Sequence, residues 1–174
     1  MGYTIMIGEA FCEVDYDDLS SCWTVHPMDG KALGAPIDSR GMTPPQHSNE
    51  TWPSYTGWAE AMKSLGLWEV WYGSDKRGSD WIAPSGESHE CLLACHPGVA
   101  RLTADHLAAF EAAADRWRTG PQMWWAGSFA STTTWHPAPA TDEAVRWNQI
   151  RADWLVWWTR WALANCKHPV VGNS

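Results

Sequence analysis

Apolar side chains recur at helical spacing in three stretches of the chain. Positions three and four residues apart lie on the same side of an α-helix, so such a stripe marks the face that the helix buries. The pattern predicts helices over about residues 54–65, 103–118 and 141–165, the last of them central to the fold. The stripes are Trp58, Met62 and Leu65 in the first helix, Leu107, Phe110, Ala114 and Trp117 in the second, and Trp147, Ile150, Trp154, Trp157 and Trp161, widened by Leu155 and Trp158, in the third.

Residues at the ends of these stretches support the same boundaries. Ser54, Thr103 and Thr141 are residue types that cap helix N-termini, because their hydroxyls accept a backbone N–H. Gly66 follows the first stripe and suits the left-handed position after a helix end. The Gly-Pro pair at 120–121 ends the second helix, since proline cannot continue it.

Strand patterns are concentrated near the N-terminus. Apolar and polar residues alternate from Tyr3 to Val14, but the apolar phase changes at residues 8–9, which predicts a β-bulge there. Residues 22–26 can pair back on this strand, and the aromatic and branched run 67–72 predicts a short buried strand. We therefore expect a single compact α+β domain spanning residues 1–174, with three helices packed on a small, mostly antiparallel sheet that long loops connect.

Tryptophan compensates for a shortage of aliphatic residues. Leu, Ile, Val and Phe together make up about 15% of the 174 residues, a share typical of disordered chains. The chain also holds 15 Trp, however, and disordered chains are poor in aromatic residues. Each indole can bury roughly 150–250 Å², so we expect a core filled largely by tryptophan.

Charge and cysteine content restrict the function classes. A net charge of −8 argues against binding long nucleic acids, which require an extended basic surface. The longest apolar run, residues 154–158, is far shorter than the roughly 20 residues of a membrane span, and the N-terminus lacks the pattern of a secretory signal. Five Cys is an odd number, which favours free thiols and a cytoplasmic location.

One short stretch has the composition of a metal site. His89, Cys91, Cys95 and His96 are residue types that zinc binds, and a metal-dependent enzyme using them is one interpretation. Their spacing matches no common structural zinc motif, and the two Cys are equally typical of small core residues. The sequence also lacks the motifs of nucleotide-binding loops, hydrolase nucleophiles and zinc proteases. We therefore expect a non-catalytic protein that needs neither metal nor cofactor.

Aromatic residues coincide with Arg, His and Asn in or beside the long loops. Aromatic faces stack on planar ligands such as nucleobases, and Arg beside them contacts phosphate or carboxylate groups. This combination predicts a pocket for a small, planar, anionic, nucleotide-like ligand. The candidate residues are Tyr55, Trp58 and Trp81 for stacking, Arg77 and Arg101 for the anionic group, and His47, Asn49 and His96 as further polar contacts.

Residues 47–174 also contain a set of spaced motifs that resembles a group of small uncharacterised phage-encoded proteins. The motifs are Ser48-Asn49, Pro53-Ser54-Tyr55 with Trp58, His96-Pro97-Gly98 with Leu102-Thr103, the run from Trp154 to Cys166, and Asn173-Ser174. The resemblance implies production in an infected bacterial cytoplasm, where such proteins include inhibitors of host defence, sponges for nucleotide signals and virion parts. An alternative is therefore an interaction or virion protein that docks through an exposed Trp patch, and a homo-oligomer is compatible with either interpretation.

Overall fold

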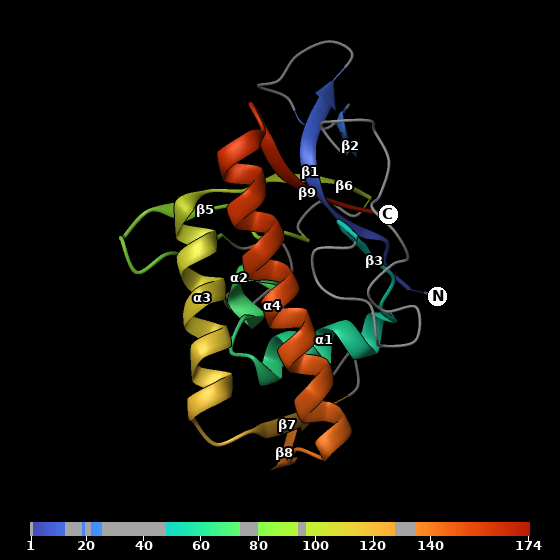
Figure 1. Cartoon of the computed structure of the whole chain (residues 1–174), viewed down its shortest axis with the longest axis vertical. Coiled ribbons are helices and arrows are strands. Elements are labelled where there is room, and N and C mark those ends of the chain that lie inside the picture. Colours follow the sequence, from blue (N-terminus) through green and yellow to red (C-terminus); the bar gives the residue numbers. More distant parts are fainter. Residues whose placement is uncertain are drawn as a thin grey trace.

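The computed structural model describes residues 2–12, 19, 22–25, 48–73, 80–93, 97–127 and 135–174, and has the predicted α+β fold (Figure 1). Its helices are α1 (Tyr55–Ser64), α2 (Trp68–Tyr72), α3 (Ala104–Thr119) and α4 (Asp142–Asn165). Its strands are β1 (Ile5–Cys12), β2 (Cys22–Val25), β3 (Glu50–Thr51), β4 (Trp81–Ile82), β5 (Ser88–His89), β6 (Gly98–Arg101), β7 (Met123–Ala126), β8 (His136–Pro139) and β9 (Pro169–Asn173).

The main sheet has five antiparallel strands, and β9 from the C-terminal end lies between β1 and β6. The other edge of β1 pairs with β3 along its first residues and with β2 along its last. β4 and β5 form one separate hairpin, and β7 and β8 form another between the adjacent ends of α3 and α4 (Figure 1). The predicted pairing of the second strand back on the first is confirmed for Cys22–Val25.

The predicted bulge in β1 is wrong. The apolar positions change phase along the strand because the sheet is buried on both of its faces. Pairing with β9 runs without interruption through Gly8 and Glu9. Ile5 and Ile7 lie in the main core, whereas Ala10 lies in a second, smaller cluster with residues of β2, β6 and β9. Successive side chains of a strand point to opposite faces, so a change of the covered face has the same sequence pattern as a bulge.

Gly172 allows the sheet to curl, because a side chain at this position would collide with β2. A Cβ at this position would lie 2.2 Å from the Thr24 hydroxyl of β2, two strands away in the sheet order. Real atoms do not approach that closely, so only glycine permits β2 to approach β9. The curl closes the second cluster, in which Cys22, Val99 and Val170 are buried.

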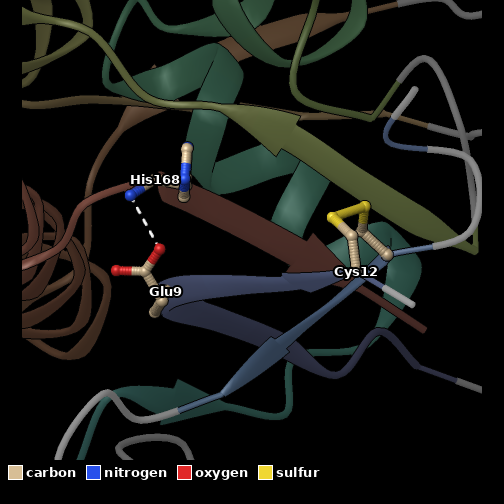
Figure 2. Close-up of a disulfide and its surroundings, with 4 residues drawn as sticks. Glu9, Cys12 and His168 are labelled. Carbon is tan, nitrogen blue, oxygen red and sulfur yellow. Dashed lines mark hydrogen bonds between the residues drawn. A yellow bond between two sulfur atoms is a disulfide. The ribbon is translucent and has the colours of Figure 1, made fainter. Parts of the chain in front are cut away.

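Glu9 fastens the junction between α4 and β9. Its carboxylate accepts hydrogen bonds from the backbone N–H groups of Lys167 and His168, each 2.7 Å long. Figure 2 shows the bond from His168. These residues connect the end of α4 to β9, so the bonds fix the direction in which the C-terminal strand enters the sheet.

The helix boundaries follow the predicted caps, but the run 67–72 is a helix rather than the expected strand. Ser54 and Thr141 accept the backbone N–H groups of Gly57 and Ala144. Gly66 has a φ of 70°, and the N–H of Leu67 bonds to the Met62 carbonyl, which closes α1 in a Schellman motif. The chain then enters α2 at once, because a short apolar run has no periodicity that separates strand from helix.

Tryptophan fills much of the core, as expected. Trp58, Trp71, Trp154 and Trp158 have no exposed surface, and the Trp58 and Trp71 rings meet edge to face. The buried stripe of α4 is displaced from the expected one: Trp157 is exposed, and the buried residues are Asn148, Ala152, Trp154, Leu155, Trp158, Thr159 and Ala162. The displacement places Leu155 and Trp158, which had only widened the expected stripe, at its centre.

No helix in the described ranges combines the length and the apolar character that crossing a bilayer demands. Even α4, the longest at 24 residues, carries charged side chains along much of its length.

Cys12 and Cys22 form a disulfide between β1 and β2, so the expectation of free thiols is wrong for this pair (Figure 2). The two residues are register partners at the end of the β1–β2 pairing, which brings their side chains together. Spacing alone could not reveal this pairing among five cysteines. Cys166 is a free thiol.

We predict that replacing both Cys12 and Cys22 by Ser lowers the free energy of unfolding by about 3 kcal/mol, because the cross-link closes a short loop in the unfolded chain. Urea denaturation without reductant measures the loss. Wild type in reductant should match the double variant, and Cys166→Ser should stay as sensitive to reductant as wild type. Alkylation of all five cysteines in unreduced, denatured protein would contradict the disulfide.

Candidate functional site

Several polar side chains meet where the β4–β5 hairpin packs on the N-terminus of α3. The hairpin turn is tight: the N–H of Ala83 bonds to the Glu87 carbonyl, and the N–H of Gly86 bonds to the Ala83 carbonyl. Gly86 has a φ of 92°, a conformation that other residues rarely adopt. The turn therefore sets the position of Ser85, Glu87 and His89 against the helix.

Asp105 joins the hairpin to α3. Its Oδ2 atom accepts a hydrogen bond from Ser85 Oγ at 2.8 Å and lies 2.8 Å from His89 Nε2. The hydrogen bond with His89, and then that from Ser85, hold the pKa of the Asp105 carboxyl below its usual range. Asp105 is therefore a carboxylate at neutral pH, and a short bond to it fixes the orientation of the His89 ring.

His106 lies one residue further along and caps the helix. Its Nδ1 accepts the backbone N–H of Thr103, whose hydroxyl in turn accepts the backbone N–H of His106, an arrangement known as a capping box. A ring that accepts at Nδ1 carries its proton on Nε2 when it is neutral. Burial, and then the charge of His89, lower the pKa of His106 to about 4, so it stays neutral at physiological pH.

The three rings of Trp81, His89 and His106 pack together behind this polar surface. The Trp81 ring centroid lies 5.5 Å from that of His89 and 5.0 Å from that of His106, and the two imidazoles are 5.0 Å apart. Trp81 and His106 are buried, whereas His89 is partly exposed. The ring packing holds His89 between the core and the surface.

Glu87, His89 and Asp105 each bring one potential metal-ligand atom to within 4.8 Å of the other two. Glu87 and His89 stand two residues apart in the hairpin, and Asp105 comes from α3. Imidazole nitrogen and carboxylate oxygen are ligands that divalent transition metals accept. Among the described residues, this is the group in which three such atoms meet.

A hollow of about 340 Å³ borders this group and is lined by Leu19, Ser88, His89, Glu90, Arg101 and Thr103. Arg101 stands on β6 with an exposed side chain, and His89 presents the ring that borders the space. A larger hollow of about 790 Å³ lies between α3 and α4. Four of its charged side chains form ion pairs, Arg118 with Asp153 and Arg160 with Glu111.

The residues expected to form one ligand pocket fall into separate places. Trp58 and Asn49 are buried, and Asn49 donates to the Ile7 carbonyl within the fold. Tyr55 packs on the Tyr3 ring at the start of α1. Trp81 and Arg101 both belong to the hairpin region, although Trp81 is buried and has no open face. His47, Arg77 and His96 lie outside the described residues.

The thiols do not join the metal-ligand group in the described structure. Cys91 is buried, and Cys95 and His96 lie outside the described residues. Burial, and then the charge of Glu9, raise the pKa of the Cys166 thiol to about 12, so it is not a nucleophile at neutral pH.

Sequence reasoning singled out His89 and Thr103 but missed Glu87, Asp105 and His106. Two local signals could have found them. Glu87 and His89 alternate in a strand pattern, which places both side chains on one face. His106 stands three residues after the cap Thr103, where a capping box has Glu or Gln. The meeting of the hairpin with Asp105 depends on tertiary packing and has no such signal.

The comparisons with known proteins assign no family to this site: no protein-family model, no curated protein and no solved structure matches the chain.

We predict that the protein loses stability as the pH falls from about 6.5 to about 4. The unfolded chain protonates His106 in this range and the folded chain does not, which corresponds to a loss on the order of 3 kcal/mol. Urea denaturation at each pH, in a buffer with a metal chelator, measures it. His106→Gln keeps an acceptor for the Thr103 N–H but does not titrate, so its stability should fall less. Equal losses in both proteins would show that His106 is not the cause.

Proposed function

We propose that the protein binds a small anionic, nucleotide-like ligand in the hollow between the β4–β5 hairpin, β6 and the start of α3. The observation that carries the proposal is that Arg101 and His89 line the same hollow. An arginine guanidinium binds phosphate or carboxylate through paired hydrogen bonds. The imidazole of His89 offers a flat, oriented surface on which a planar group can stack.

The rigidity of the site supports binding. Trp81 and His106 pack behind His89, and Asp105 fixes its ring by a 2.8 Å contact, so little side-chain freedom is lost when a ligand arrives. The volume of about 340 Å³ lies at the lower end of small-molecule sites, which favours a mononucleotide over a dinucleotide.

The proposal includes a biological setting. A protein that holds a nucleotide without transforming it removes that nucleotide from solution, which is the counter-defence role that the resemblance to phage-encoded proteins suggests. This role places the protein in a bacterial cytoplasm. The Cys12–Cys22 disulfide counts against that location, because disulfides are rare in the cytosol.

We predict saturable heat when wild-type protein is titrated with nucleoside monophosphates in a calorimeter. Arg101→Ala should weaken binding about 10-fold or more without a change in circular dichroism, because a hydrogen bond to a charged group contributes roughly 1.5–3 kcal/mol. Arg160→Ala, which removes an exposed arginine of α4, serves as the matched control and should bind normally.

Two results would contradict this function. One is the absence of both heat and a shift in melting temperature for a panel of monophosphates and cyclic dinucleotides. The other is unchanged affinity in Arg101→Ala, which would remove that residue from the site.

A second candidate function rests on one exposed aromatic pair. Phe11 of β1 and Trp23 of β2 are 48% and 44% exposed, and their ring centroids are 5.0 Å apart. Paired aromatic rings on a surface are typical of contacts between proteins, so the pair supports docking to another chain or to a second copy. Size-exclusion chromatography distinguishes this docking function from ligand binding. A concentration-dependent oligomer that is lost in the Phe11→Ser and Trp23→Ser variants supports docking.

A further inference from the structure

We propose that Glu87, His89 and Asp105 bind one divalent transition-metal cation of the Zn²⁺ class. The three ligand atoms come from two elements that the fold holds together, and they lie within 4.8 Å of one another. Metal–ligand bonds to zinc are about 2.0–2.2 Å long, so atoms this close can share one ion after small side-chain movements. A bound cation would give the junction between the hairpin and α3 a role beyond holding the two elements together.

The donor types select the class of metal. One imidazole and two carboxylates suit zinc, manganese or cobalt, whereas magnesium and calcium take oxygen ligands almost exclusively. Both described hydrogen bonds of Asp105 go to Oδ2, so Oδ1 accepts none within the described structure. Glu87 is exposed and can turn toward the ion without losing a buried contact.

Among the described residues around the site, acidic side chains outnumber basic ones. Asp80, Glu87, Glu90 and Asp105 lie on or beside the hairpin, and Arg101 is the cation that lines the adjacent hollow. Opposite charges attract strongly where the surroundings are partly buried, so this excess of carboxylates favours a cation.

Buried His106 supplies a second, independent observation. Its Nε2 has no hydrogen-bond partner among the described residues, although the residue is only 1% exposed. The ring lies against Trp81 and His89, on the side of α3 that faces the hairpin. Because Nδ1 accepts from Thr103, Nε2 carries a proton and is not itself a ligand, but it can donate to a water or anion that the cation brings.

The cation would also complete the proposed function by giving the hollow a second positive charge for an anionic ligand. The inference does not rest on that function, because cation binding stands without a nucleotide. Zinc binding without nucleotide binding would reject the proposed function and keep the cation site. Nucleotide binding without zinc binding would keep the proposed function and reject the cation site.

The test titrates metal-free, full-length protein with ZnCl₂ in a calorimeter, in a buffer without phosphate or nucleotide. We expect one Zn²⁺ per chain in wild type. Glu87→Gln, His89→Gln and Asp105→Asn should each lose at least about 10-fold in affinity, because each removes one ligand. His136→Gln and Asp115→Asn, at an exposed histidine of β8 and an exposed acid of α3, are matched controls and should bind as wild type does.

Cobalt replaces zinc in a second measurement that identifies the donors. A Co²⁺ spectrum without a thiolate charge-transfer band supports the nitrogen and oxygen set. A thiolate band would overturn the proposal in favour of cysteine ligands such as Cys91 or Cys95. Absence of zinc binding in wild type, or affinity unchanged in all three ligand variants that circular dichroism shows to be folded, would also overturn it.

Discussion

The pairing of β9 between β1 and β6 is the interaction on which the rest of the structure depends. It joins the C-terminal residues to the first strand and to the strand that leads into α3. Glu9 fixes the entry to β9, and Gly172 allows β2 to curl over it. Because β6 ends two residues before the cap of α3, the same pairing sets where Arg101 and the start of α3 stand relative to the hairpin.

The buried tryptophans contribute to the stability of the fold rather than to a binding surface. Trp154 donates its indole N–H to the Ser48 carbonyl, and Trp117 donates to the Val145 carbonyl, so these side chains link distant segments as well as filling the core. Trp81, which loop position made a candidate for stacking, is buried behind two imidazoles. The side chains that meet between the hairpin and α3 outside this core, Ser85, His89 and Asp105, are polar, which shifts attention from aromatic faces to histidine and carboxylates.

The sequence predicts the local features of this fold well and the tertiary ones poorly. Ser54, Gly66, Thr103 and Thr141 mark helix ends because capping acts through neighbouring backbone groups. The run 67–72 contains a helix where the sequence predicts a strand, because length and composition alone do not separate a buried strand from a short helix. The sequence offers His89 as one of four residues in an alternative metal interpretation and Arg101 as an anion contact. The partner of His89 depends on a hairpin that docks on a helix residue 16 positions away.

The central claim is that this docking builds a cation site at the edge of an anion-binding hollow. X-ray diffraction from crystals grown with zinc, collected at the zinc absorption edge, tests it most directly. The account predicts one anomalous peak enclosed by Glu87, His89 and Asp105, within bonding distance of all three. A zinc peak held by the cysteines or by other histidines, with none at the hairpin, would contradict it.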